Sequence, residues 1–214
     1  MRVLIACESS GRVRQAFREL GHDAYSNDLL PADDSSPFHI LGDCVSTISL
    51  GWDLIIMHPP CTALCVSGNR WYGRGAPKHD ARLRSITWTM RLWELALSNA
   101  SAVAMENPVG VLPLPPTQYI QPWQFGHGET KKTGLWLHNL PLLRPTDVVG
   151  GRKQAVWRMA PSADRWKKRS VTYQGIAAAM AAQWSAPAPV MLQLQFPFLS
   201  APESPAESGA SSVC

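Results

Sequence analysis

Short apolar runs and amphipathic segments alternate along the first half of the chain. Apolar runs at residues 2–7 and 53–57 predict strands from their lengths and bounding turn residues, and residues 22–27 are a further short strand candidate. Residues 12–20 carry apolar side chains at helical spacing, and Gly21 follows them, so this segment is predicted to be a helix. The alternation of strands and helices predicts an α/β domain built on a mostly parallel sheet.

The pattern continues in the second half. Residues 80–99 form the clearest amphipathic helix, and residues 101–105 form the strand that follows it. Prolines exclude long helices from residues 113–145, where the apolar run at 135–137 predicts a β-ribbon. An Ala-rich helix is expected at residues 176–184.

Length and composition indicate one catalytic domain with a tail. A chain of 214 residues can bury a sizeable core, and we expect a single domain over residues 1–184. Residues 185–214 are rich in Pro, Ala and Ser and are predicted to be a disordered tail. The formal charge of +4 and the pI of about 8.9 fit an anionic partner such as nucleic acid without requiring one.

The cysteines give no sign of a disulfide framework or a metal site. The five form an odd set with no C-x-x-C pair and no His/Cys cluster at zinc-finger spacing, so no metal is expected. Glu8 and Arg12 interrupt the first apolar run, unlike a signal peptide, and no apolar segment approaches the roughly 20 residues of a membrane span. We therefore expect no membrane partner and a reducing cytoplasm, either bacterial or that of the host cell if the protein is viral.

The stretch from Trp52 to Cys61 organises the chemistry that the sequence suggests. It begins as a buried strand and stops at Pro59 and Pro60, which can continue neither a helix nor a central strand, and Cys61 follows directly. Ligands bind at the carboxyl edge of parallel strands, so Cys61 is a candidate nucleophile. The alternative is a small buried side chain in a turn.

A second strand end carries a carboxyl group. The strand at 101–105 ends at Glu106, Asn107 and Pro108, and one helix separates it from the strand before Cys61, so the two strands are expected to be neighbours. A thiol adds well to an electron-poor ring carbon, and a carboxyl group that binds a ring nitrogen stabilises the charge that develops. The pair therefore suggests covalent chemistry on a heterocycle.

The first turn suggests an adenosyl ligand. The segment from Cys7 to Gly11 joins the first strand to the first helix without a G-x-G-x-x-G motif, so NAD and FAD are not expected. An adenosyl ligand that lacks a pyrophosphate is a better match, because Glu8 would repel phosphates. Ser9 and Ser10 alternatively serve as a helix N-cap pair. Asp28 follows the second strand, as the acid of a Rossmann-like unit does.

Two segments combine cations with aromatic side chains. Residues 62–80 are predicted to be a mobile loop that includes Asn69 and Arg70, and residues 152–169 are strongly basic. Cations meet phosphates and aromatic faces stack on bases, so both segments are candidates for nucleic-acid contact. A charge run of this kind is alternatively a solvated face.

These motifs, in this order, resemble the DNA (cytosine-5)-methyltransferases over roughly residues 1–184. His58-Pro59-Pro60-Cys61 is similar to the family's Pro-Cys nucleophile motif, and Met105-Glu106-Asn107-Pro108 is similar to its Glu-Asn-Val motif. The resemblance implies a Rossmann-like S-adenosylmethionine-dependent methyltransferase fold, with helices on both faces of the sheet. It also implies that Cys61 attacks C6 of a cytosine flipped out of DNA, that Glu106 binds N3 and the exocyclic amine, and that C5 takes the methyl group from S-adenosylmethionine.

The resemblance extends to the cofactor site and to the base. Lys131 and Thr133 stand where the family has the arginines of Gln-x-Arg-x-Arg, and Tyr173 opens a segment similar to its late Gly-Asn motif. The residues predicted to be catalytic are Cys61, Glu106 and Lys131. The predicted cofactor contacts are Cys7, Glu8, Ser9, Gly11, Asp28, Asp43, Pro59, Tyr173 and Gly175. The predicted DNA contacts, from the motifs and the two basic segments, are Pro60, Asn69, Arg70, Asn107, Thr133, Arg165, Lys168 and Arg169.

The sequence leaves three functions open. Residues of about 138–170 offer only a short recognition insert, so target choice is expected to be loose or to depend on the segments at 62–80 and 152–169. The first function is cytosine C5 methylation of DNA. The second is methyl transfer to a free cytosine nucleotide, to RNA or to an exocyclic amine, and the third is DNA binding without catalysis. The oligomeric state is open, with a monomer favoured.

Overall fold

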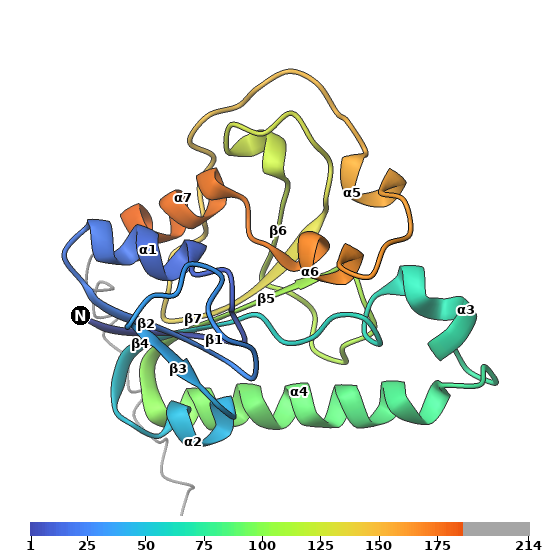
Figure 1. Ribbon diagram of the computed structural model, residues 1–214, viewed down its shortest axis with the longest axis horizontal. Helices are drawn as coiled ribbons and strands as arrows, with labels where there is room; N and C mark the ends of the chain where they lie inside the picture. Colours follow the sequence, from blue (N-terminus) through green and yellow to red (C-terminus); the bar gives the residue numbers. More distant parts are fainter. Residues whose placement is uncertain (186–214) are drawn as a thin grey trace, which may run out of the picture.

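The protein is a seven-stranded mixed sheet with helices on both faces (Figure 1). The computed structural model describes residues 1–185. The strand order is β3-β2-β1-β4-β5-β7-β6, in which β7 is antiparallel to both of its neighbours and the pairs from β3 to β5 are parallel. The strands are β1 (Arg2–Ala6), β2 (Asp23–Asp28), β3 (His39–Leu41), β4 (Trp52–Met57), β5 (Ala100–Pro108), β6 (Gln118–Ile120) and β7 (Thr133–His138).

This arrangement confirms the predicted α/β class, a Rossmann-like fold with a mostly parallel sheet and helices on both faces. The α-helices are α1 (Arg12–Glu19), α2 (Cys44–Ile48), α3 (Asn69–Tyr72), α4 (His79–Asn99), α5 (Ala155–Arg158), α6 (Arg165–Ser170) and α7 (Gln174–Trp184), and the 3₁₀ helices are η1 (Val66–Gly68) and η2 (Pro122–Gln124). None of the helices within residues 1–185 combines the length and the apolar character needed to cross a membrane. The predicted tail at 185–214 lies, beyond Ser185, outside the described residues.

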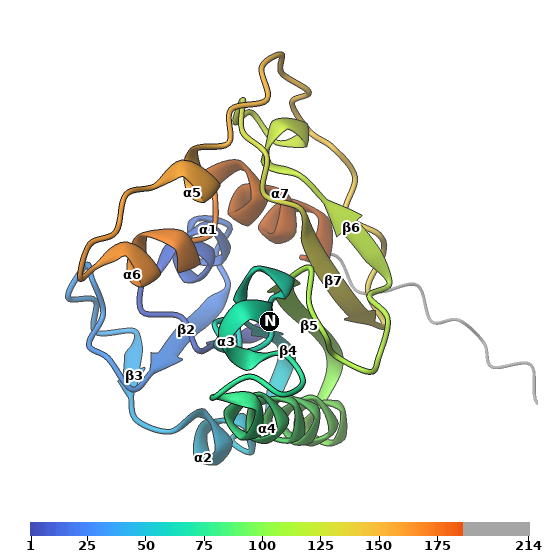
Figure 2. The same cartoon turned by 90° about the vertical axis from the view of Figure 1, so that its right-hand side faces the viewer.

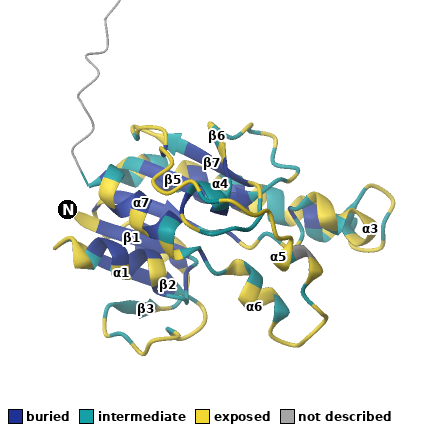
Figure 3. Cartoon of the chain, turned by 90° about the horizontal axis from the view of Figure 1, so that it is seen from above, coloured by how far each residue is buried: buried dark blue, intermediate teal, exposed yellow. Residues whose placement is uncertain are grey.

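The sheet separates two hydrophobic layers. Helices α1 and α7 cover one face, and α2 and the long α4 cover the other (Figure 1). Side chains alternate between the faces along each central strand, so Ile5 and Ile56 join the α1/α7 layer while Leu4 and Ile55 join the α2/α4 layer. The central strands are mostly buried, with one exposed residue each in β1 and β4, and exposed residues are frequent in α3 and α6 (Figure 3). The buried apolar runs that predicted these strands are thus explained by burial on both faces.

The strand before Glu106 is longer than predicted. The predicted end was at Met105, whereas β5 continues to Pro108. The reason is that β7 pairs with β5 beyond the point where β4 has ended, with Glu106 opposite Leu135 and Pro108 opposite Thr133. The predicted β-ribbon is therefore β6 and β7, and it extends the sheet along the carboxyl end of β5.

The segment at residues 62–80, which was predicted to be a mobile loop, contains the short helices η1 and α3. Its anchor is Arg82, which is 5% exposed although charged. The Arg82 guanidinium donates hydrogen bonds to the carbonyl oxygens of Ala63 and Cys65 and to the side-chain oxygen of Asn69. One buried cation on α4 therefore holds the turn that carries Cys61, a long-range contact that local composition does not report.

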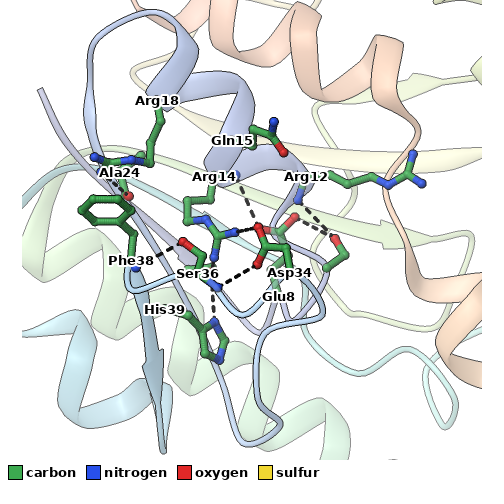
Figure 4. Close-up of polar contacts among 12 residues, drawn as sticks. Glu8, Arg12, Arg14, Gln15, Arg18, Ala24, Asp34, Ser36, Phe38 and His39 are labelled. Carbon is green, nitrogen blue, oxygen red and sulfur yellow. Dashed lines mark hydrogen bonds and ion pairs between the residues drawn. The ribbon is translucent and has the colours of Figure 1, made fainter.

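A second buried arginine fixes the segment between β2 and β3 (Figure 4). Arg14 on α1 is 1% exposed, forms an ion pair with Asp34 and donates a hydrogen bond to the Ser26 hydroxyl at 2.8 Å. Ser26 in turn contacts His39 Nδ1 at 2.8 Å. Burial opposes ionisation of Asp34, but the hydrogen bond and charge of Arg14 outweigh it and lower the pKa of that carboxyl group. This network holds the loop that brings Asp33 to the functional cavity.

Replacing Asp34 by alanine should destabilise the protein by about 2 kcal/mol, because it leaves the Arg14 guanidinium buried beside Ser26 without its counter-ion. This loss of stability is smaller than for a fully buried ion pair, because the Asp34 side chain is 41% exposed. Urea unfolding measures the change. Folding lowers the pKa of Asp34, so its ionised form stabilises the folded protein fully above pH 3.8, the ordinary pKa of the carboxyl group. The effect of the substitution should therefore shrink as the pH falls below 3.8 and through the lowered pKa.

The matched control is Asp33→Ala. Asp33 pairs with Lys167 at 2.6 Å, but both side chains are more than 30% exposed, so the expected loss is below about 1 kcal/mol. Equal losses in the two variants would contradict the assignment of Asp34 as the counter-ion that the fold requires.

Candidate active site

A large cavity within the described residues lies at the carboxyl ends of β1, β2, β4 and β5, the edge at which open α/β sheets bind ligands. Its volume is about 680 Å³, within the range of small-molecule sites. The view in Figure 2 shows α3, α5 and α6 lying around this end of the sheet. The predicted site residues that line the cavity are Cys7, Glu8, Ser9, Asp28, Pro59, Pro60, Cys61, Glu106, Asn107, Lys131, Arg165 and Arg169.

The register of β4 and β5 decides which side chains meet. Met57 is paired with Met105, so the next residues along each strand, His58 and Glu106, lie side by side. His58 Nδ1 is 3.2 Å from Glu106 Oε2, and the two side chains are 8% and 13% exposed. Cys61 follows three residues later in the turn, on the wall of the same cavity. The strands of Cys61 and Glu106 are adjacent, as predicted, but the hydrogen-bond partner of Glu106 is His58.

Glu106 is held as a carboxylate. Burial acts to raise its pKa, but the hydrogen bond from His58 and the positive charge of Lys131 outweigh burial, so the pKa lies below the ordinary value of 4.5. Lys131 is itself fixed, because its ammonium donates a hydrogen bond to the Arg169 carbonyl oxygen at 3.0 Å. The site thus combines a buried anion, a cation and a histidine at one strand end.

Cys61 is held as a thiol. Burial is the main cause that raises its pKa above the ordinary value of 9.0, with Cys65 and Glu106 acting in the same direction and Lys131 against them. Because the nucleophile is the thiolate, chemistry at Cys61 needs a group that takes its proton.

Asn107 anchors the turn that carries the cysteine. Its amide nitrogen donates a hydrogen bond to the Pro59 carbonyl oxygen at 2.9 Å, and its residue is 1% exposed. Its amide oxygen is buried and has no hydrogen-bond partner among the described residues. An unpaired buried acceptor is costly, so Asn107 offers a position for a ligand donor as well as a structural tie.

In the first turn, Glu8 occupies the N-terminal end of α1. The Glu8 carboxylate accepts the Val13 N–H at 2.9 Å and the Ser10 hydroxyl at 3.0 Å, so it caps α1 from within the protein. Ser9 and Ser10 are therefore not the N-cap pair of this helix, although Ser10 Oγ lies 3.4 Å from the Arg12 nitrogen. An acidic side chain occupies the place where a phosphate would otherwise bind.

Two further predicted cofactor contacts lie on the cavity wall. Asp28 ends β2, and its carboxylate accepts the Leu30 N–H at 3.0 Å. Cys7 has its sulfur 3.7 Å from that of Cys44, and the hydrogen bond to Cys44 and burial raise the pKa of Cys7. Together with Glu8, these residues give the β1/β2 end of the cavity an acidic and thiol character without a phosphate-binding loop.

The structure does not bring four predicted cofactor residues to the cavity wall. Asp43 caps α2 by accepting the Val45 N–H, and Gly11 adopts a positive φ of 69° beside Arg14. The Tyr173 hydroxyl donates a hydrogen bond to Glu129 at 2.5 Å, and burial together with this hydrogen bond raises the pKa of Tyr173. The Gly175 N–H donates a hydrogen bond to His127 Nε2 at 3.0 Å. The contacts of these four residues are structural ones in the described molecule, and their contact with a cofactor stays a prediction.

The predicted DNA contacts divide between the cavity and the outer surface. Arg165 and Arg169 line the cavity from α6, whereas Lys168 pairs with Asp164 at 2.6 Å on the outside. Asn69 and Arg70 lie on the exposed α3, outside the cavity lining, and the Thr133 hydroxyl donates to the Lys131 carbonyl oxygen. The basic segment predicted to contact nucleic acid thus folds back over the site.

Several residues of the cavity wall were not among the individually predicted site residues, notably His58, Asp33, Cys65, Trp71 and Lys167. A signal existed for His58, because it precedes Pro59 at a strand end and the edge rule that selected Cys61 applies to it equally. Lys167 and Asp33 lie far apart in the chain, and only their 2.6 Å ion pair identifies them. Within residues 1–185, no cluster of three or more Cys, His, Asp or Glu side chains has the geometry of a metal site.

Similarity to known proteins is found among solved structures and not among sequences. No family model matches the chain, and no curated protein sequence matches it. Among solved structures, the chain is similar to the Dnmt2 methyltransferase of S. pombe, with 12% identity over 77% of this chain and a TM-score of 0.45. The match covers 56% of the length of that protein. Residue roles here must therefore come from the geometry of the site itself.

Proposed function

We propose that this protein transfers a methyl group from S-adenosylmethionine to C5 of cytosine in DNA, through a covalent adduct of Cys61 with C6. The observation that carries the proposal is the meeting of a cysteine and a buried carboxylate, Glu106, on one cavity wall at the carboxyl ends of adjacent strands. This pair matches the demands of nucleophilic addition to a pyrimidine ring, which needs a soft nucleophile and a group that binds the ring nitrogen and amine.

The residues at the β1/β2 end of the cavity fit S-adenosylmethionine. Glu8 and Asp28 are acceptors suited to an amino group and to ribose hydroxyls, and their charge suits a sulfonium cation. The capping of α1 by Glu8 excludes a pyrophosphate from that helix end, which agrees with a ligand that has none. When bound, S-adenosylmethionine supplies an electrophilic methyl group.

The protein side of the reaction follows from the site. Cys61 Sγ bonds to C6, which makes C5 nucleophilic, and Glu106 with Lys131 nearby orients the base and offsets the charge that develops on it. After C5 is methylated, loss of its proton and departure of the Cys61 thiolate restore the aromatic ring. A base inside a duplex cannot reach Cys61, so a DNA substrate must be flipped out.

One observation favours a second substrate, a free cytosine nucleotide. Arg165, Lys167 and Arg169 line the cavity from α6, and a phosphate close to the base would meet these cations. In this alternative the α5–α6 segment encloses a small substrate instead of contacting a duplex.

The test supplies S-adenosylmethionine with a labelled methyl group together with cytosine-containing DNA, RNA or nucleotides, followed by mass spectrometry of the nucleosides. Labelled 5-methylcytosine in DNA is the expected product. The label in nucleotides alone would select the second substrate, and the label on an exocyclic amine would contradict the covalent mechanism. DNA binding without any transfer and without a thermal shift from S-adenosylmethionine would favour a non-catalytic protein.

A further inference from the structure

His58 has one ring nitrogen bound and one free. Nδ1 lies 3.2 Å from Glu106 Oε2, while Nε2 is buried and has no hydrogen-bond partner among the described residues. The side chain is 8% exposed and lines the cavity. Most buried polar atoms in proteins are paired, so an unpaired ring nitrogen on a cavity wall points to a ligand or a reacting group. If Nδ1–H donates to Glu106 in the neutral ring, Nε2 carries the lone pair.

Cys61 needs a proton acceptor, and the unpaired ring nitrogen of His58 is one. The thiol must lose a proton before it attacks, and the other candidates on the cavity wall are already committed. Glu106 is bound by His58, Glu8 caps α1, and the Lys131 ammonium is a donor bound to the Arg169 carbonyl oxygen. Asp28 accepts the Leu30 N–H, and Asp33 pairs with Lys167. In the neutral ring, His58 Nε2 is the acceptor that remains without a partner among the described residues, and histidine is the side chain that most often serves as a general base.

We propose that His58 is a catalytic base in this site, which takes the Cys61 proton on Nε2 while Glu106 orients the ring and stabilises its charge. The arrangement of a cysteine, a histidine and a carboxylate is the general one for an activated nucleophile, with the base oriented by a third group. As a role in methyl transfer, it rests on the function proposed above.

The side chains of the site and the substrate base account for every proton that moves in the addition step. The Cys61 S–H bond breaks, its electron pair forms the bond to C6, and the proton goes to His58 Nε2. The C5=C6 electron pair moves into the ring, where N3 becomes basic. The Nδ1 proton passes to Glu106, from which N3 receives it, so the net transfer is from sulfur to N3. When the thiolate leaves, the same path runs in reverse, and the C5 proton is lost to water.

Other charges in the cavity act on the same pair. The acids and thiols are Glu8 in the turn after β1, Asp28 and Asp33 at and after the end of β2, Cys61 and Cys65 after β4, and Glu106 on β5. The cations are Lys131 before β7 and Arg165, Lys167 and Arg169 on α6. A variant of His58 therefore has to preserve the hydrogen bond to Glu106, so that these other charges keep their positions.

The experiment measures alkylation of Cys61 by iodoacetamide in the full chain, with peptide mass spectrometry, over a range of pH. His58→Asn keeps an N–H donor near the Nδ1 position but cannot carry a proton. At about pH 7 we expect Cys61 in this variant to react at least about tenfold more slowly than in the wild type. The two rates should converge at high pH, where the thiol ionises unaided. Alkylation of Cys65 in the same spectra is the internal control and should be unchanged.

Superimposable pH profiles for the wild type and His58→Asn would overturn the proposal and leave His58 as a group that only positions Glu106. Thermal unfolding checks the fold of the variant, and His58→Gln is the second variant if His58→Asn does not fold. The measurement needs no methyl acceptor. If the wild type methylates no cytosine substrate, the proposed function fails, while the alkylation profile still decides whether His58 is the base for Cys61.

Discussion

Cys61→Ala should lower methyl transfer by about 10⁴-fold or more, because the covalent step has no other nucleophile at that position. The fold should be retained, since Cys61 lies in a turn and the substitution removes a single sulfur atom. The thermal shift produced by S-adenosylmethionine should also be retained, because the acidic end of the cavity at Glu8 and Asp28 is untouched. Radiolabel transfer and thermal unfolding measure the two quantities on one preparation.

The control for Cys61 is Cys65→Ala. Cys65 lines the same cavity and its sulfur contacts the Ser67 hydroxyl at 3.1 Å, but it has no role in the proposed reaction. Oligonucleotides with 5-fluorocytosine give a second readout, because fluorine at C5 cannot leave as a proton does and the adduct should persist. Wild type and Cys65→Ala should be trapped, and Cys61→Ala should not. Full activity of Cys61→Ala would remove Cys61 from the mechanism.

Gly175→Ala should destabilise the protein by about 3 kcal/mol. Gly175 lies in the first turn of α7, where a Cβ atom would overlap the Phe125 carbonyl oxygen, a backbone atom that cannot turn away. Phe125 is 1% exposed, so the strain passes into the α1/α7 layer of the core. The sign is informative, because glycine to alanine within a helix otherwise stabilises by up to about 1 kcal/mol. Urea unfolding measures the change.

Gly150→Ala is the matched control. A Cβ atom at Gly150 would meet nothing within 4 Å, and its backbone is not in the left-handed region, so we expect a change within about 0.5 kcal/mol of zero. A stabilised Gly175→Ala variant would mean that α7 does not press on residues 125–127 in solution as it does in the structure.

The resemblance implies a cofactor contact for Gly175, which stays a prediction, and the structure adds a packing role. Its nitrogen donates to His127 Nε2, and its missing side chain allows α7 to approach Phe125. Helix α7 in turn packs on α1, whose N-terminus is capped by the cavity residue Glu8. Packing through α7 and α1 thus connects Gly175 to the first turn.

Local patterns predicted the secondary structure well and its ends less well. The buried strands and the long helix were found because apolar spacing depends on which faces are buried, and that spacing is written in the sequence. The end of β5 was missed because Pro108 stops a local pattern but not a strand whose antiparallel partner β7 continues beside it. The short helices within residues 62–80 were not predicted, because Arg82, which holds this segment through hydrogen bonds, lies outside it.

The fold class, and the edge of the sheet at which Cys61 and Glu106 lie, could be predicted from local patterns. Both follow from strand ends marked by prolines and from the rule that consecutive parallel strands share one carboxyl edge. The contacts between individual side chains could not be predicted in this way. The pairing of Met57 with Met105 places His58 against Glu106, and the path of α6 places the basic segment over the cavity. Strand register and long-range ion pairs depend on contacts between residues that are far apart in the chain, so local periodicity does not predict them.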